Sequence, residues 1–248
     1  MTTHYSNVND ALALFDDTQL KFEPGSQFSY STYGTVLLSA VMQEAAEQPF
    51  LELMQQQVFT PLELEHTGEE SQFKDQGKLA TFYWNDAGKS QKVRAWRDVD
   101  LSHRLAGGGF VSTSSDLVRL GNAYFNEQFI SSKTKQKIWT PQRLSSGDIN
   151  QQNYGIGWRI DQMTVNGKTV NYMHHGGVSR GAQSVLVLVP EYKLSIAMNI
   201  NANTEEFGSF SKIWKELTIS FINASEQAKL AVHTQQQRFQ TEASDSSD

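Results

Sequence analysis

A tyrosine lies on a loop directly before a long apolar segment. The stretch Tyr30-Ser31-Thr32 follows Pro24-Gly25 and leads into residues 34–47, which carry no charge before Glu44. A tyrosine in this position, with a small polar side chain two residues later, suits a site in which a phenol relays a proton. The alternative is a structural tyrosine whose ring packs and whose hydroxyl bonds locally. The segment alone leaves both interpretations open.

A second candidate segment is His174-His175-Gly176-Gly177-Val178. Glycines let the backbone approach a ligand closely, and they leave a strand-edge N–H able to donate to a developing oxyanion. The histidine pair also suggests a metal site. However, adjacent strand residues point to opposite faces, and no third ligand lies at a supporting spacing. We therefore expect no metal and no cofactor, and a structural role remains the alternative for each histidine ring.

A third segment, Ala106-Gly107-Gly108-Gly109-Phe110, is a glycine run. It lacks the Gly-x-x-x-x-Gly-Lys pattern and does not follow an apolar parallel strand, which argues against phosphate binding. A tight turn is the simpler interpretation.

Composition excludes several functions. The chain has 248 residues, a net charge of -6 and no cysteine. Nucleic acid and anionic membranes require clustered positive charge, so neither is an expected partner, and thiolate catalysis and Cys-type zinc sites are excluded. No stretch approaches 18 uninterrupted apolar residues, so we expect no membrane span. The first residues lack a leader pattern, which predicts a cytoplasmic chain as written, or a periplasmic or secreted one if a signal peptide was encoded upstream.

The elements that must position these segments follow from the spacing of apolar residues. Strand-like alternation covers four consecutive segments with short turns at Asn166-Gly167 and Pro190-Glu191, which predicts an antiparallel sheet. A following helix at residues 210–221 has an apolar stripe that can cover one sheet face. The expected strands are residues 154–160, 168–174, 182–189 and 193–199, and the other expected helices are residues 9–15, 34–47 (buried), 49–58, about 114–124 and 132–139.

Four groups of residues, taken in order, carry a resemblance to a known family. They are residues 22–32, Pro61-Leu62-Glu63-Leu64 with Thr67, the Ala106–Phe110 run with Ser112-Thr113 and Asp116-Leu117, and His175-Gly176-Gly177 with Gly181. Together they resemble the serine β-lactamase-like and penicillin-binding-protein superfamily, which includes class C β-lactamases, D-Ala-D-Ala carboxypeptidases and related esterases. Within it, the pattern is similar to the mitochondrial β-lactamase-like branch and its bacterial relatives. The resemblance extends from about residue 5 to residue 221.

The resemblance implies an α/β (α+β) fold of the β-lactamase/transpeptidase type. We expect an antiparallel sheet with a covering C-terminal helix and a mostly helical subdomain, with the first strands and the nucleophile helix missing. This gives a partial domain at residues 1–225, comprising a helical and loop subdomain at about 34–150 and the sheet with its helix at about 151–222. Residues 226–248 are rich in Gln, Ser and Asp, and are expected to form a disordered tail.

The family uses three elements: Ser-x-x-Lys, Tyr-x-Asn, and Lys-x-Gly or His-x-Gly on a sheet-edge strand. By resemblance, Tyr30 helps to move the proton between nucleophile, leaving group and water. His175 and Gly177 form the third element, and the N–H of Val178 is one oxyanion donor. Thr32 stands where most members have Asn, which leaves its contact with a substrate amide in question. His175 in place of Lys is usual in esterase-like and peptidase-like members and counts against strong β-lactamase activity.

The nucleophile motif does not precede Tyr30. No Ser-x-x-Lys lies among the 29 residues before it, and the three later matches begin at Ser71, Ser132 and Ser209, where the expected context does not suit a nucleophile. Without a nucleophile and its lysine base, covalent acyl transfer does not start. Either the start codon was assigned too late, which we favour, or the chain is a truncated homologue.

The expected function is that of a serine hydrolase acting on an amide or ester through an acyl-serine intermediate, with a peptide or small ester as substrate. This chain alone is expected to be inactive. The alternative is a non-catalytic homologue with a binding, filament or scaffold role, which could form a homo-oligomer.

Overall fold

The centre of the molecule is a four-stranded antiparallel sheet in the order β5-β6-β7-β8. The computed structural model describes residues 3–14, 19–84, 94–96, 99–179, 181–203 and 207–245. Asn166 and Gly167, both at positive φ, turn the chain between the first two strands, as the sequence predicted. The predicted antiparallel sheet is confirmed. Its strands are β5 (Arg159–Val165), β6 (Lys168–Ser179), β7 (Ala182–Val189) and β8 (Leu194–Ile200).

The first strand begins later than the sequence predicted. Residues 154–160 were expected to form it, but only an isolated bridge joins Tyr154 to Arg159. Gly157 has a φ of +76°, and a Cβ at Gly155 would come within 2.1 Å of the carbonyl oxygen of Ile138. The chain therefore turns between residues 153 and 158, and regular pairing starts only at Arg159.

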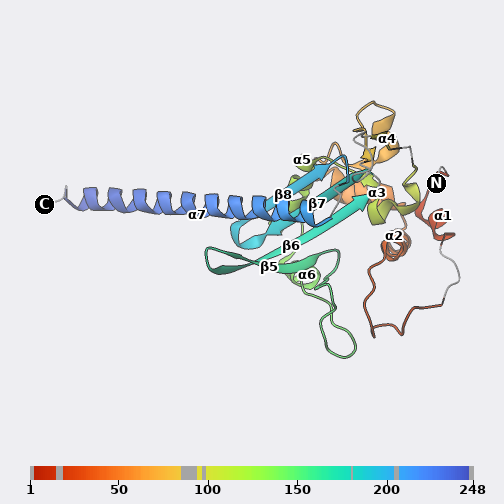
Figure 1. The fold of residues 1–248 in the computed structure, drawn as a ribbon, viewed down its shortest axis with the longest axis horizontal. Helices are drawn as coiled ribbons and strands as arrows, with labels where there is room; N and C mark the ends of the chain where they lie inside the picture. The colour runs from red at the N-terminus through yellow and green to blue at the C-terminus, as the bar shows by residue number, and fades with distance from the viewer. Residues whose placement is uncertain are drawn as a thin grey trace.

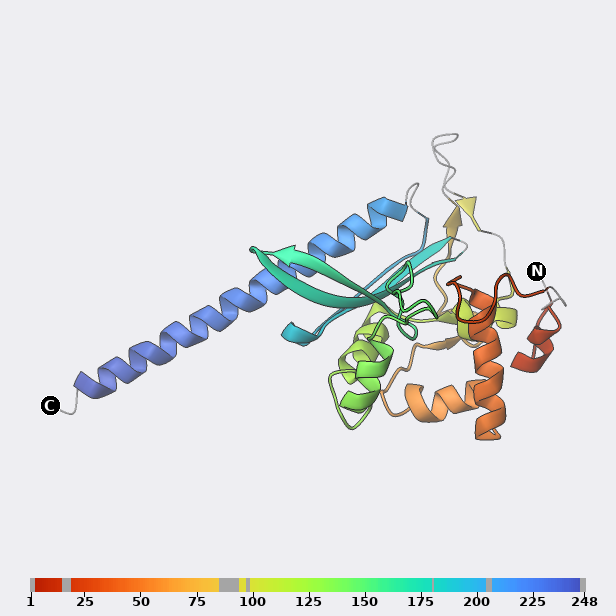
Figure 2. The same ribbon diagram turned by 90° about the horizontal axis from the view of Figure 1, so that it is seen from below.

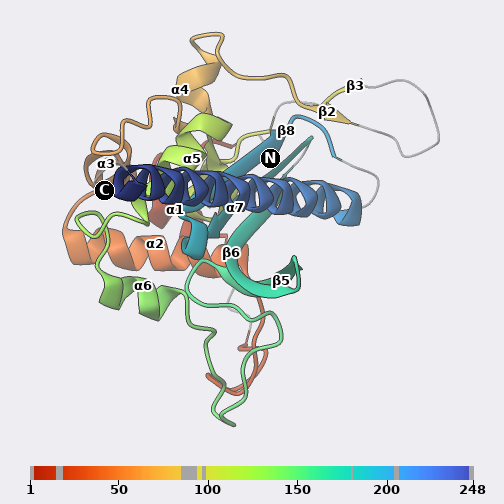
Figure 3. The ribbon, with the colours of Figure 1, turned by 90° about the vertical axis from the view of Figure 1, so that its left-hand side faces the viewer.

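Helices cover both faces of the sheet (Figure 2). On one face, α7 (Phe207–Asp245) packs through Phe210, Trp214 and Ile222 on the valines of β7. On the other face, Leu117 and Leu120 of α5 (Ser114–Ala123) pack against Leu186 and Leu188. Successive residues of β7 thus alternate between two cores, because side chains in a strand point to opposite faces. Figure 3 shows α7 crossing in front of the strands.

The three N-terminal helices form a smaller core of their own. It joins Val8 and Ala11 of α1 to Val36 and Ala40 of α2, and to Phe50 of α3. Helix α2 was expected to be buried, but only one side of it is. The bounds of these and the remaining helices are α1 (Val8–Leu12), α2 (Thr32–Ala46), α3 (Phe50–Met54) followed by a π-turn at Gln55–Phe59, α4 (Glu70–Lys74) and α6 (Ser132–Ile138).

The outer side of α2 is apolar and exposed. Leu37, Leu38, Val41 and Met42 are 40% to 58% exposed, because no described element packs against that side. The absence of charge in this segment therefore predicted the helix correctly but overstated its burial.

The described residues between 68 and 111 form short strands and turns besides helix α4. Strand β1 (Gly68–Glu69) pairs with β4 (Phe110–Val111), and β2 (Tyr83–Trp84) pairs with β3 (Arg94–Ala95). A 3-10 turn at Ser102–Arg104 leads into a π-turn at Leu105–Gly109.

Helix α7 continues far beyond the sheet (Figure 1). The expected disordered tail from residue 226 differs from the structure, which draws the chain as helix through Asp245. Residues 226–245 contain no Gly or Pro and are rich in Gln and Ala, which have high helix propensity. They extend a helix already started on the sheet, so no new nucleation is needed. No helix in the described ranges is long and apolar enough to cross a bilayer.

Two phenylalanines of α7 test how this helix is held. Phe210 is 1% exposed and Phe221 is 52% exposed. Phe210→Ala should lower the free energy of unfolding by about 3–5 kcal/mol, because it opens a cavity under the helix. Phe221→Ala, the matched control, should change it by less than about 1 kcal/mol. Urea denaturation measures both, and equal losses would contradict this packing.

Candidate active site

The outer edge of β6 is open beyond His174. In the described residues, β5 pairs with β6 from Lys168 as far as His174, whereas β7 pairs with β6 up to Ser179. In an antiparallel strand, alternate N–H groups point to alternate sides. Residues 175–179 therefore present backbone groups away from β7 that no strand covers.

At this edge, His175 meets a tyrosine that sequence reasoning had not singled out. The hydroxyl of Tyr154 and Nε2 of His175 lie 3.1 Å apart and form a hydrogen bond. Their rings meet edge to face, with centroids 5.9 Å apart. The imidazole is therefore held by a side chain from the loop that precedes β5.

Tyr30 joins this pair to form a cluster. Its ring centroid lies 6.0 Å from that of His175 and 5.8 Å from that of Tyr154. The guanidinium of Arg159 lies over both tyrosine rings, with its Cζ 5.7 Å from each centroid, in the geometry of cation–π contacts. Tyr30 is 39% exposed, so one side of the cluster opens to solvent. The structure thus brings Tyr30 and His175 together.

Asn150 fixes the loop that carries Tyr154. Its side chain is 2% exposed. Its Oδ1 accepts from the N–H of Tyr154 at 2.9 Å, and its Nδ2 donates to the carbonyl of Tyr154 at 2.7 Å and to that of Gln142 at 2.9 Å. These bonds replace the strand ladder that this turn lacks, and they set where the phenol points.

The segment before α2 is also held by local contacts. The N–H of Ser145 donates to the carbonyl of Gly25, and the Phe28 ring lies 5.6 Å from Tyr154, centroid to centroid. Ser31 then caps α2 by accepting from the N–H of Gly34 at 3.1 Å. Tyr30 is therefore fixed between a loop contact on one side and a helix cap on the other.

Burial keeps His175 and Tyr154 uncharged. Burial, the nearby charge of Arg159 and the neighbouring His174 lower the pKa of His175 to about 4. Burial, together with Tyr30, raises the pKa of Tyr154 to about 12, although Arg159 acts in the opposite direction. At pH 7 both groups are neutral, so His175 offers a hydrogen bond here and not a positive charge.

The other predicted site residues surround the cluster. Gly177 faces open space, since a Cβ there would meet no atom within 4 Å. Val178 is 53% exposed at the open edge. Thr32 is the first residue of α2, and Gly107 packs against it so closely that a Cβ would come within 2.6 Å of the Thr32 side chain. The glycine run therefore serves a close packing contact.

His174 lies on the opposite face of β6. Its Nε2 is 2.9 Å from Asp161 Oδ2, and its ring lies 5.2 Å from that of Trp214 in α7. The two histidines thus have different neighbours on different faces. Among the residues that the structure describes, no group of three or more His, Asp or Glu side chains is arranged to hold a metal ion.

The three downstream Ser-x-x-Lys matches lie on helices outside the cluster. Ser71 lies in α4, Ser132 in α6 and Ser209 in α7, and all three are exposed. Ser132 donates its hydroxyl to Glu127. None has a hydrogen bond or ring contact with Tyr30, Tyr154 or His175 in the described part of the chain.

Tyr154, Arg159 and Asn150 were missed by sequence reasoning. A signal was present, because residues 150–157 contain Asn150, Asn153, Gly155 and Gly157 and so have the composition of a turn. Binding and catalytic residues often lie on such loops, which makes a tyrosine there a candidate site residue. The segment was assigned instead to a strand.

Together, the antiparallel sheet, its covering C-terminal helix and the helices on the other face define a β-lactamase/transpeptidase-like fold. A family model described as Beta-lactamase matches residues 1–216. The chain belongs to this family of serine hydrolases, as the resemblance of its motifs predicted.

Individual relatives support the same family and fold. The chain is 32% identical over 215 residues to the mitochondrial serine beta-lactamase-like protein LACTB of Bos taurus, which covers 79% of this chain and 38% of that protein. Among solved structures, it is similar to a penicillin-binding protein from Bacillus halodurans, with a TM-score of 0.67, 22% identity, and 86% of this chain and 63% of that chain covered. A D-amino acid amidase from Ochrobactrum anthropi SV3 gives a TM-score of 0.64 at 22% identity, covering 84% and 60%. The chain thus spans little more than a third of the mammalian relative's length.

The low pKa of His175 makes stability depend on pH. The folded state disfavours protonation of this ring. The contribution of the neutral ring to the free energy of unfolding is therefore fully present above pH 6.5 and is lost as the pH falls toward 4. We expect His175→Gln to remove up to about 3 kcal/mol of that acid-induced loss. Urea unfolding at pH 7 and pH 4.5 measures it, with His66→Gln, an exposed histidine, as the control. An unchanged pH dependence in His175→Gln would refute this.

Asn150 offers a second test. Asn150→Ala removes its bonds to the Tyr154 and Gln142 backbone and leaves buried polar groups unpaired. The free energy of unfolding should fall by about 2–4 kcal/mol. Asn171→Ala, on the exposed part of β6, is the control and should cost under about 1 kcal/mol. Similar losses for both variants would show that the side chain of Asn150 does not hold this loop.

Proposed function

We propose that this chain supplies the acid–base and oxyanion side of a serine hydrolase site that cleaves a peptide amide or a small ester. The Tyr30 hydroxyl transfers the proton between the nucleophile, the leaving group and water. His175 and Gly177 border the scissile bond, and the N–H of Val178 donates to the developing oxyanion. Tyr154 is a positioning residue that acts through His175.

In the proposed reaction, a serine Oγ attacks the carbonyl carbon and its proton passes to the leaving amine or alcohol. The resulting acyl-serine reacts with water, which releases the acid and returns a proton to the serine. The serine and its lysine are not among the residues of this cluster, so the proposed reaction requires a Ser-x-x-Lys segment from outside residues 1–248. The chain by itself is accordingly proposed to be inactive.

The observation that carries the proposal is the meeting of Tyr30 and His175 at an uncovered strand edge. A structural tyrosine would be expected to be more buried and to bond locally, whereas Tyr30 is 39% exposed. The neutral state of His175 fits hydrogen bonding to an uncharged ester or amide better than pairing with a charged group. It also fits the expected preference for esterase-like or peptidase-like chemistry.

A burst assay with a nitrophenyl ester tests the proposal. The 248-residue chain should give no burst, whereas a form extended upstream with a Ser-x-x-Lys segment should give one. In the extended form, Tyr30→Phe should lower kcat/KM about 100-fold or more, because a phenylalanine cannot carry the proton. The control is Tyr192→Phe, which should leave the rate unchanged. The hydroxyl of Tyr192 donates to Glu226 of α7.

Two outcomes would sink the proposal. The first is hydrolysis by the 248-residue chain that disappears in Ser71→Ala or Ser132→Ala. The second is full activity of Tyr30→Phe in the extended form. Concentration-dependent polymers without hydrolysis, seen by light scattering, would favour the binding or scaffold alternative.

A further inference from the structure

Arg159 belongs to the cluster at the edge of β6, but the proposed reaction gives it no role. Its guanidinium lies over the rings of both Tyr30 and Tyr154. Its Nη2 also donates to Gln152 Oε1 at 2.9 Å. A guanidinium is planar, so it can stack on aromatic rings while its N–H groups bond elsewhere. Arg159 therefore connects the two phenols to the loop that precedes β5.

The start of β5 fixes the position of Arg159. Trp158, one residue earlier, is 6% exposed and packs with leucines of β7 in the core beside α5. An isolated antiparallel bridge pairs Arg159 with Tyr154. The guanidinium and the phenol that bonds to His175 are therefore carried by directly paired residues of one turn.

The buried amide of Asn150 also supports Arg159, through Gln152. Asn150 Oδ1 accepts from the N–H of Gln152 at 3.2 Å as well as from the N–H of Tyr154. The side chain of Gln152 in turn accepts from Arg159. One buried side chain thus fixes the backbone of Tyr154 and that of the residue that holds the guanidinium.

Arg159 also places a fixed positive charge near His175. Among the described residues, the titratable or charged side chains around His175 are Tyr30, Tyr154, His174 and Arg159. Burial is the largest cause of the low pKa of His175, and the charge of Arg159 is the next. A guanidinium does not lose its proton in proteins, so it disfavours a second positive charge on the imidazole over the whole working pH range.

We infer that Arg159 is a second positioning residue of the proposed site, which holds the rings of Tyr30 and Tyr154 together beside His175 and places a fixed cation next to them. Arg159 does not touch the reacting atoms. It acts through Tyr30, whose hydroxyl it keeps in one place, and through His175, whose ring it keeps neutral. The inference rests on the proposed function, because the proton transfer by Tyr30 is the step that the positioning serves.

NMR of the 248-residue protein tests both effects without any reaction. In Arg159→Gln, the ring signals of Tyr30 and Tyr154 should move toward the positions of exposed tyrosines, because the stacked cation is lost. The His175 ring should titrate about one pH unit higher in this variant, because a positive neighbour is removed. Arg159→Lys keeps the charge but not the planar fork, so the tyrosine signals should still move while the titration of His175 stays close to that of the parent. Loss of a signal in Tyr30→Phe, Tyr154→Phe or His175→Gln assigns it.

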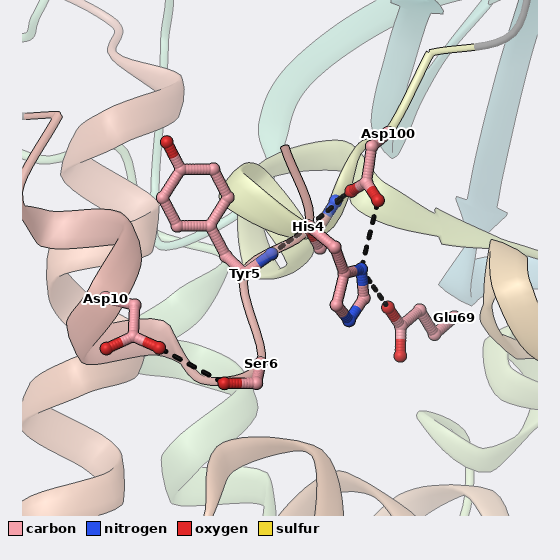
Figure 4. Close-up of polar contacts among 7 residues, drawn as sticks. His4, Tyr5, Ser6, Asp10, Glu69 and Asp100 are labelled. Atoms are coloured by element: carbon pink, nitrogen blue, oxygen red, sulfur yellow. Dashed lines mark hydrogen bonds and ion pairs between the residues drawn. The ribbon is translucent and has the colours of Figure 1, made fainter. Parts of the chain in front are cut away.

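Two controls separate these effects from general damage. Arg119→Gln changes an exposed arginine that pairs with Glu63 at 3.3 Å, and it should leave all of these signals in place. His4 is the internal reference in each variant, because its ring lies 3.0 Å from Asp100 and 3.9 Å from Glu69 (Figure 4). Its signal should stay where it is in the parent, which shows that a change at His175 is local.

The extended form gives a kinetic test of the same role. Arg159→Gln should lower kcat about ten-fold and change KM less than about three-fold, because the proton carrier is misplaced while the binding contacts remain. In a Tyr30→Phe background, Arg159→Gln should cause little further loss, since a residue that acts through Tyr30 has nothing left to position. A purely structural arginine would lower both rates by the same factor.

The inference fails if the tyrosine signals of Arg159→Gln match those of the parent, if the titration of His175 is the same in both, or if the losses from Arg159→Gln and Tyr30→Phe simply multiply. The NMR results do not depend on the burst assay. If the extended form gives no burst while Arg159→Gln still moves both sets of signals, the proposed function fails and the placement of these rings by Arg159 stands. If the burst occurs and the signals do not respond, the inference fails and the proposed function stands.

Discussion

The site depends on one constraint: β6 is longer than the strand beside it. Because β5 begins at Arg159, opposite His174, the last five residues of β6 keep pairing with β7 and leave their other edge uncovered. An uncovered strand edge offers backbone donors to whatever lies beside it. Here the loop of Tyr154 and the segment of Tyr30 lie beside it, and their rings meet His175. The two-sided core around β7 supports this edge, since the valines and leucines of β7 are buried against helices on both faces.

Desolvation decides the chemistry that this edge can support. A lysine at the position of His175 would carry a charge, whereas the buried imidazole beside Arg159 stays neutral above about pH 4. The cation of the cluster is instead Arg159, which lies over the two phenol rings. Positive charge is thus held to the side of the proposed scissile bond. This separation of charge from the reacting position agrees with an uncharged ester or amide as the group that reacts.

Local patterns predicted the sheet and most helices, and they singled out Tyr30 and His175 as candidates while leaving a structural role open for each. The alternation in residues 182–189 and the Asn166-Gly167 turn are strong local signals, and both appear in the structure. The segment 154–160 misled because its apolar residues resemble a strand, while the close approach of Gly155 to Ile138 is a tertiary contact that no local pattern reveals. Tyr154 was missed for the same reason. The helix beyond residue 226 was missed because polar composition was weighed above helix propensity.

The most direct test of the central claim is a crystal structure of the upstream-extended, Ser-x-x-Lys-bearing form after reaction with a fluorophosphonate. The phosphonyl oxygen mimics the oxyanion of acyl transfer. The account predicts an adduct on that serine, with the oxygen about 3 Å from the backbone N–H of Val178 and the Tyr30 hydroxyl directed at the modified serine. An adduct on Ser71, Ser132 or Ser209, or one remote from Tyr30 and Val178, would contradict it.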